Sequence, residues 1–194
     1  HFAQATEHGG RLAPIDKVVS PEPVLTEAIE LVARDIADRY AGTMSDVLRL
    51  AIPPRNARAE AHPRLPQGAE SDVREFEPFV WPQHAHGKEY LTALRLGQAP
   101  RAVFDVVPAS DIYQLVAEAI AAARASGRGA IVCVPDGSSL AEWDRRFAEI
   151  LGPDNHVLLS STQKPAVRYR SFVRVARGEV RVVVGTRGAA WAPV

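Results

Sequence analysis

The sequence contains very little cysteine and lysine. Its 194 residues include one cysteine, Cys133, and three lysines, Lys17, Lys88 and Lys164. A single cysteine can neither close a disulfide within the chain nor supply a cysteine-based zinc cluster. Arginine is therefore almost the whole basic repertoire, and its planar fork suits paired contacts with phosphate. The cysteine usage fits a reducing, cytoplasmic setting.

Long apolar runs and an export signal are also missing. No stretch approaches the ~20 apolar residues of a membrane-spanning helix. The start, "HFAQATEHGG", has no basic segment followed by an apolar one. We therefore expect a globular, cytoplasmic chain without a membrane partner. Because 23 basic residues balance 23 acidic ones, a nucleic-acid surface would have to be a local patch.

The first third of the sequence predicts a tether followed by two helices. Residues 1–20 contain isolated prolines and are interpreted as an extended tether, and residues 21–58 as a helical segment. A helical apolar stripe begins beside Thr26 and stops at Gly42; it is formed by Leu25, Ile29, Val32, Ile36 and Tyr40. Thr43 and Asp46 have the spacing of a capping box and predict a second helix that ends before Pro53. Its expected buried side is formed by Val47, Leu48 and Ala51.

Residues 59–100 are rich in proline and charge and are interpreted as a linker. Three aromatic residues are candidate anchors, namely Phe76, Phe79 and Trp81, and "KEYLTALRL" predicts one short helix. The three histidines, His62, His84 and His86, lack nearby carboxylates or thiols. We therefore expect them to be exposed to solvent and expect no metal site.

From residue 101 the pattern alternates between apolar strand and amphipathic helix. The expected strands are residues 102–107, 130–134, 156–159 and 180–184. This alternation predicts an α/β domain with a four-stranded parallel sheet. Ligands of such sheets gather at the carboxyl ends of the strands. The candidate binding residues at those ends are Pro135, Asp136, Gly185, Thr186 and Arg187.

Two stretches in this region carry a family resemblance. "AIVCVPDGSSLAEWDRRF" and "VARGEVRVVVGTRGAAWAP" resemble the first motor lobe of the PriA (primosomal protein N′) family of bacterial replication-restart helicases. "SPEPVLTEAIELVARDIADRYAGTMSDVLRLAIPP" is similar to the start of that family's winged-helix domain. The resemblance implies a RecA-like superfamily 2 lobe over residues 101–194, preceded by a winged-helix-type segment. The lobe would be truncated, because the family's acidic metal-binding motif, zinc-binding cysteines and second lobe are not in this sequence.

The sequence departs from the family at the nucleotide-binding loop. The P-loop should fall on residues 106–113, which read "VVPASDIY". A P-loop needs glycines and a lysine so that backbone amides and a cation can reach the phosphates. Ser110 and Asp111 instead precede Ile112, where the lysine belongs, and Tyr113 stands where the serine or threonine belongs. Gly87-Lys88 does not replace the motif, because no strand precedes that pair. We therefore expect no ATP hydrolysis.

The resemblance implies DNA as the partner. In the family the Gly-Thr-Arg junction contacts the nucleic-acid backbone, which points to Gly185, Thr186 and Arg187. The implied function is replication restart and primosome assembly at stalled or forked DNA, by a chain from a family of ATP-dependent 3′-5′ helicases. Forked or single-stranded DNA, single-strand-binding protein and other primosome proteins are the implied partners. The family's ATP, magnesium and zinc are not expected in this chain.

Alternatives remain open at each position. Gly185 could simply end a strand, Thr186 could cap the next helix and Arg187 could pair with a carboxylate, while Pro135 and Asp136 fit an ordinary turn. Two arginine groups, Arg168/Arg170/Arg174/Arg177 and Arg49/Arg55/Arg58, fit solvated helix faces better than phosphate-binding stripes. A different α/β domain that binds nucleotides or small molecules is the alternative function. It lacks support because no Gly-x-Ser-x-Gly or His-Glu-x-x-His motif is present.

Overall fold

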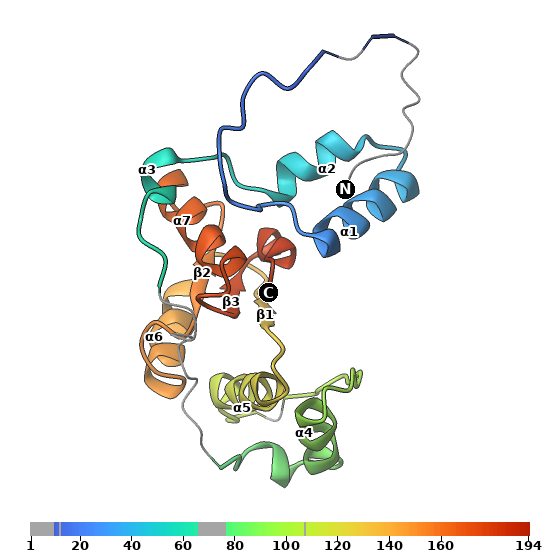
Figure 1. The fold of residues 1–194 in the computed structure, drawn as a ribbon. Helices are drawn as coiled ribbons and strands as arrows, with labels where there is room; N and C mark the ends of the chain where they lie inside the picture. The colour runs from blue at the N-terminus through green and yellow to red at the C-terminus, as the bar shows by residue number, and fades with distance from the viewer. Residues whose placement is uncertain (1–9, 12, 66–76, 107) are drawn as a thin grey trace.

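A computed structural model describes residues 10–11, 13–65, 77–106 and 108–194. Its last part is a three-stranded parallel sheet with helices on both faces (Figure 1). The strands are β1 (Ala130–Cys133), β2 (Val157–Leu159) and β3 (Val182–Gly185), in the order β1-β3-β2. Cys133 and Leu159 both pair with Gly185, so the three strands end in register. The predicted parallel α/β class is therefore confirmed.

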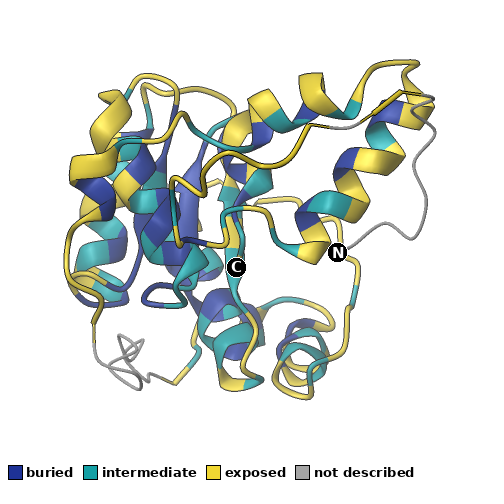
Figure 2. Cartoon of the chain, turned by 45° about the horizontal axis from the view of Figure 1, so that its top comes forward, coloured by how far each residue is buried: buried dark blue, intermediate teal, exposed yellow. Residues whose placement is uncertain are grey.

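The central strand β3 divides the core into two layers. Val183 belongs to one cluster, together with Phe172 of α7 (Pro165–Ala176) and residues of the short 3-10 helix η2 (Arg187–Trp191). Val182 and Val184 belong to the opposite cluster, which includes residues of α5 (Ile112–Ala125) and α6 (Leu140–Ile150). All three valines of β3 are fully buried (Figure 2). The continuous apolar run is thus explained by helices on both faces.

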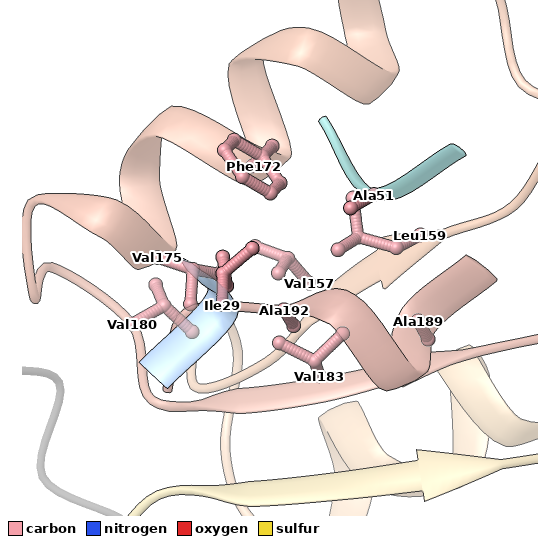
Figure 3. Packing of buried hydrophobic residues seen from close by; sticks show 10 residues of the cluster. All are labelled: Ile29, Ala51, Val157, Leu159, Phe172, Val175, Val180, Val183, Ala189 and Ala192. Carbon is pink, nitrogen blue, oxygen red and sulfur yellow. The ribbon is translucent and has the colours of Figure 1, made fainter. Parts of the chain in front are cut away.

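The two predicted N-terminal helices are present as α1 (Glu27–Arg39) and α2 (Met44–Ala51). Thr43 accepts a hydrogen bond from the Asp46 amide, so the predicted cap of the second helix is confirmed. Thr26 accepts one from the Ile29 amide and caps α1 in the same way, which the sequence analysis did not predict. Ile29 and Ala51 join the sheet cluster around Phe172 and Val183 (Figure 3). The helix pair therefore packs on the sheet layer formed by α7 and η2.

The buried face of α1 differs from the predicted stripe. The buried residues are Ile29, Ala33 and Ala37, whereas Leu25, Val32 and Tyr40 are exposed. Ala33 and Ala37 cluster with Val47 of α2. Small side chains let the two helices approach closely, and this packing outweighs the larger apolar residues on the neighbouring face.

The predicted first strand, residues 102–107, is wrong over its described part. Residues 101–106 are irregular, and residue 107 lies outside the described residues. Val103 is fully exposed, and the Phe104 ring lies 5.1 Å from the Trp81 ring. Phe104 therefore packs on the aromatic cluster of the preceding segment, away from the sheet. The sheet has three strands among the described residues, with β1 at an edge.

The stretch before α5 is held by one buried carboxylate. The Glu118 side chain, 1% exposed, accepts hydrogen bonds from the amides of Phe79, Val80 and Trp81 at 2.9–3.2 Å. The Trp81 indole donates to the Leu115 carbonyl at 2.7 Å. Two short helices follow, η1 (Trp81–Gln83) and α4 (Gly87–Arg95), which confirms the short helix expected in the linker. Trp81 is thus an anchor of this segment, as expected. The Phe79 side chain is 57% exposed and only its backbone amide contributes, so Phe79 is not an aromatic anchor, and Phe76 lies outside the described residues.

A group of buried charges ties the N-terminal stretch to α7. Arg177, at the end of α7, pairs with Glu22 at 2.8 Å and donates to the Glu60 carbonyl at 2.8 Å. Glu60, in the short helix α3 (Ala57–Glu60), accepts from Arg55 at 2.6 Å and from the Ser20 hydroxyl. Arg177 therefore does not lie on the solvated helix face that its spacing predicts. It is a buried structural cation.

This charge cluster predicts loss of stability in acid. The hydrogen bond from Arg177 lowers the pKa of Glu22, and the hydrogen bond from Ser20, with Arg55, lowers the pKa of Glu60. A carboxyl whose folded-state pKa is depressed stabilises the fold above its unfolded pKa of about 4.3, and this stability is lost as pH falls through the lowered value. Urea unfolding at pH 7 should show Glu22→Gln to be less stable than wild type. The difference should shrink as pH falls below the unfolded pKa and through the lowered pKa of Glu22. A difference that stays constant over this fall in pH would contradict the linkage.

Candidate nucleic-acid interface

The carboxyl ends of all three strands meet at one edge of the sheet. Cys133, Gly185 and Leu159 lie side by side, and the Val134 amide donates to the Gly185 carbonyl at 2.8 Å. The loops that follow β1 and β2 also approach each other. A Cβ at Gly137 would lie 3.6 Å from the Thr162 side chain. Residues that follow different strands are therefore brought together here, as a parallel sheet requires.

Gly185 is required by close packing. A Cβ at this position would lie 1.9 Å from the Leu159 carbonyl oxygen and 2.7 Å from the Ala189 Cβ. Both distances are far inside van der Waals contact. The missing side chain lets β2 pair with β3 while η2 folds back over the strand end. Gly185 therefore shapes the edge through its backbone.

Thr186 and Arg187 begin η2, which turns away from the sheet. The Ala189 amide donates to the Thr186 carbonyl at 2.7 Å, whereas the Thr186 hydroxyl makes no capping hydrogen bond. Arg187 is exposed. Among the described residues neither side chain has a hydrogen-bond or ion-pair partner. The alternatives of a capping threonine and an ion-paired arginine are therefore not what the structure contains.

Thr186 and Arg187 line a cleft of about 560 Å³. Its walls come from four parts of the chain: the end of α2, the end of β2 with the loop that follows, α7, and the β3–η2 junction. The polar lining residues are Arg49, Ser160, Ser161, Arg168, Thr186 and Arg187. Apolar walls are provided by residues that include Ile52, Phe172 and Trp191.

The cleft has a uniform positive charge. Arg49, Arg168 and Arg187 line it, and no Asp, Glu, His or Cys is among its described lining residues. None of the three guanidinium groups makes a hydrogen bond or ion pair within the described part of the chain. Unpaired arginines around a hollow favour an anionic ligand, because phosphate accepts paired N–H donors from guanidinium.

Pro135 and Asp136 lie at the same edge but outside the cleft lining. The Asp136 carboxylate accepts hydrogen bonds from the Ser138 hydroxyl at 2.5 Å and from the amides of Ser138 and Ser139 at 2.8 and 3.3 Å. The hydrogen bond from the Ser138 hydroxyl lowers the pKa of Asp136 most, and the two amide hydrogen bonds lower it further. The geometry is that of an ordinary turn at the start of α6. A negative charge here does not favour a direct phosphate contact.

The residues at the expected P-loop position contact other protein groups. The Asp111 carboxylate accepts from the amides of Tyr113 and Gln114 at 3.0 and 3.1 Å, which makes Asp111 the N-cap of α5. The same carboxylate pairs with Arg146 of α6, whose guanidinium lies 5.5 Å from the Tyr113 ring centre. Ile112 is partly exposed, and Ser110 makes no hydrogen bond among the described residues. The amides that a nucleotide phosphate would use at a helix start are thus already occupied.

Comparison with known proteins gives one consistent result. The chain is 38% identical over 189 residues to a protein named probable replication restart protein PriA of Mycobacterium tuberculosis, and 38% identical over 198 residues to that of Mycobacterium leprae. Each match covers 97% of this chain. The matches support the PriA family. The chain spans 29% of the length of these PriA relatives.

No family model matches the chain, and no solved structure does. Support for the PriA family therefore rests on the sequence relatives, and the parallel sheet is consistent with a RecA-like lobe. Of the five binding residues that the PriA resemblance indicates, Thr186 and Arg187 line the cleft, whereas Gly185, Pro135 and Asp136 do not. No helix in the described part of the chain is long and apolar enough to cross a membrane.

Four polar residues of the cleft were not expected from the sequence, namely Arg49, Ser160, Ser161 and Arg168. Arg49, like Arg168, was expected on a solvated helix face. Ser160 and Ser161 follow β2 directly, as Thr186 follows β3, so the end-of-strand rule that identified the PriA-like Gly-Thr-Arg junction could have found them. Arg168 was assigned to a solvated helix face because its spacing matches that of Arg170, Arg174 and Arg177. The structure separates these four: Arg168 lines the cleft, Arg170 is exposed, Arg174 lies 3.7 Å from Glu179 and Arg177 is buried.

The histidines that could bind a metal do not form a ligand cluster in the described part of the chain. Within the described ranges no three His, Cys, Asp or Glu residues come together as metal ligands. His62 and His86 are exposed, whereas His84 is half-buried and its ring lies 4.7 Å from the Phe104 ring. The expected solvent exposure thus applies to two of the three histidines. Gly87, the glycine of the Gly-Lys pair, packs against the Trp81 carbonyl, where a Cβ would lie 1.8 Å away.

Proposed function

We propose that this chain is a DNA-binding part of a replication-restart protein and that it acts at stalled or forked DNA. The single observation that carries the proposal is the cleft at the carboxyl edge of the sheet. Among the described residues its three arginines are unpaired, and none of its lining residues is acidic. The PriA relatives supply the biological setting, because the names printed for them are replication restart proteins. DNA would be the partner, and single-strand-binding protein and other primosome proteins would be further partners.

The arrangement suits the sugar-phosphate backbone better than base edges. Arg187 begins η2 immediately after a buried strand, so its backbone is fixed while its side chain projects from the core. Phosphate contacts of this kind fix orientation and add affinity without reading sequence. The proposed binding is therefore sequence-independent and sensitive to salt.

The proposed division of the chain follows the sequence analysis. Residues 1–20 would act as a tether, residues 21–58 as a winged-helix-type segment and residues 59–100 as a linker. Residues 101–194 would form part of a RecA-like motor lobe. Because α2 contributes Arg49 to the cleft, the helical segment and the lobe would bind DNA together.

We expect no binding of Mg-ATP to this chain. Asp111 caps α5 in place of a phosphate, and Ile112 stands where a P-loop lysine would be. Asp111→Ala should lower the free energy of unfolding by about 1 kcal/mol, the usual cost of a lost N-cap, without creating a nucleotide site. Calorimetry should show no heat of binding for wild type or variant. Micromolar binding that is abolished by substitution of Ser110 or Asp111 would show that this loop binds nucleotide by other means.

Arg187→Ala should weaken DNA binding about equally for all sequences. Loss of one phosphate contact should also reduce the slope of log affinity against log salt by about one. Arg187→Lys should recover only part of the affinity, because a point charge replaces the two-pronged fork. Fluorescence anisotropy with forked and single-stranded oligonucleotides measures both quantities.

The matched control for this experiment is Arg58→Ala. Arg58 is exposed on α3, lies outside the cleft and has no ion-pair partner among the described residues. Arg58→Ala removes one positive charge, as Arg187→Ala does, and should leave the DNA affinity nearly unchanged. If Arg187→Ala lowers thermal stability but leaves DNA affinity and salt slope as in wild type, Arg187 has a structural role and the proposed contact is wrong.

A further inference from the structure

The most unusual cation in the cleft is Arg168, in the first turn of α7. Its Nε is buried and has no hydrogen-bond acceptor. No carboxylate pairs with its guanidinium in the described part of the chain. A buried donor without an acceptor is rare in folded proteins and is accounted for by a water, an ion or a ligand that completes the site. Arg168 therefore needs an acceptor that the described chain does not supply.

The surroundings of Arg168 indicate what that acceptor is. Arg49 and Arg187 line the same cleft from α2 and η2, so three cations from three elements line one hollow. No counter-charge lies among the described lining residues. Hydroxyl groups of Ser161 and Thr186 are in the lining and make no hydrogen bond within the described residues. Three arginines with hydroxyl donors are the chemistry of a phosphate site.

The loop before α7 is already ordered for such a role. The Ser160 amide donates to the Gln163 side chain at 3.0 Å, and the Ser160 and Thr162 hydroxyls are 2.9 Å apart. Tyr169 and Phe172, which flank Arg168 on α7, are 1% exposed. The backbone that carries Arg168 is thus fixed by the core, and the ordering cost of binding a ligand is correspondingly small.

We propose that Arg168 is the fixed arm of a three-arginine phosphate site, in which Arg168, Arg49 and Arg187 together hold one backbone phosphate of a nucleic-acid strand. This inference rests on the proposed function and assigns residues that the Gly-Thr-Arg junction alone does not indicate. A cleft of about 560 Å³ is larger than one phosphate needs, and its apolar walls at Trp191 and Ile52 leave room for sugar or base. A strand therefore fits the cleft better than a free phosphate ion does.

A double-mutant cycle tests the proposal. Binding of a single-stranded oligonucleotide is measured at low salt for wild type, Arg168→Ala, Arg187→Ala and the double variant. Arg168→Ala should weaken binding about tenfold. Both arginines hold the same phosphate. The fold-loss of affinity in the double variant should therefore be clearly smaller than the product of the fold-losses in the two single variants. Arg49→Ala in place of Arg168→Ala should couple to Arg187 in the same way.

Arg170→Ala is the matched control, because Arg170 lies on the same helix, is exposed and does not line the cleft. Its effect should be small and should combine with Arg187→Ala as a simple product. Equal losses for Arg168→Ala and Arg170→Ala, or no coupling between Arg168 and Arg187, would overturn the phosphate site. The proposed DNA binding would survive that result if Arg187→Ala alone still weakened binding.

A second measurement separates a strand from a free ion and does not depend on DNA affinity. Melting temperature is recorded against inorganic phosphate and against a short oligonucleotide. The oligonucleotide should stabilise wild type and Arg170→Ala at far lower concentration than phosphate does, and Arg168→Ala should lose that stabilisation. Stabilisation by phosphate alone would show a free-anion site and overturn the strand. If neither ligand stabilises wild type, or if all variants respond equally, the site itself is wrong.

Discussion

Replacing Gly185 by alanine should lower the free energy of unfolding by about 3 kcal/mol or more, because overpacking at a rigid site is among the most damaging single changes. The new Cβ would lie 1.9 Å from the Leu159 carbonyl oxygen, which is backbone within the sheet, and 2.7 Å from the Ala189 Cβ. Neither neighbour can move without breaking the β2–β3 pairing or displacing η2. A loss of this size corresponds to a fall of about 6–12 °C in melting temperature for a chain of this length.

Gly188→Ala is the control for this prediction. It lies three residues further on, and an added Cβ would meet nothing within 4 Å. Its effect on stability should stay within about 0.5 kcal/mol. Urea unfolding of both variants measures the difference. If Gly185→Ala is as stable as wild type, the close approach at the end of β3 is not a constraint on the fold.

Glu118→Ala should be the other strongly destabilising change, at about 3 kcal/mol or more. The buried carboxylate accepts hydrogen bonds from the amides of Phe79, Val80 and Trp81. Alanine would remove this acceptor from all three amides. The stretch that contains η1 should then detach from α5. Hydrogen exchange should show loss of protection at these three amides while the amides of β3 stay protected.

Glu118→Gln separates acceptor loss from charge loss. The amide retains one oxygen, so this variant should lose less stability than Glu118→Ala and keep part of the exchange protection. Glu149→Ala, at an exposed carboxylate that pairs with arginines on α6, should cost less than about 1 kcal/mol. A Glu118→Ala chain with unchanged protection at residues 79–81 would show that other contacts hold this segment.

Local signals predicted the helices and the parallel pairing well. The caps at Thr26 and Thr43 act through hydrogen bonds to residues three positions away, so they can be read from neighbouring residues. The apolar run of β3 predicts burial on both faces, and the structure contains it as the central strand. These features depend on sequence spacing alone.

Features that depend on tertiary contacts could not be predicted in the same way. Residues 102–106 are apolar enough for a strand, yet Phe104 packs on Trp81, a contact that the local pattern does not encode. The role of Glu118 is similar, because its partners lie 37–39 residues away in the chain. Propensity is a weak guide where such packing competes with it.

The candidate site was predictable in its position and only partly in its residues. The end-of-strand rule indicates the edge where Thr186 and Arg187 lie. Arg49 and Arg168 join them only because α2 and α7 pack on the same sheet layer, and helical spacing cannot distinguish Arg168, which lines the cleft, from the exposed Arg170. Charge counts could not reveal this patch, since the whole chain is neutral.

The most direct test of the central claim is a hydrogen-exchange footprint of the chain with and without forked DNA at low salt. We expect added protection in three of the four backbone segments that line the cleft, residues 49–53, 159–161 and 186–188, and loss of that protection as salt is raised. The aromatic cluster around Trp81 and Phe104 should exchange at the same rate in both states. No footprint at all, or a footprint on the Trp81 cluster with the cleft unchanged, would contradict DNA binding at this edge of the sheet.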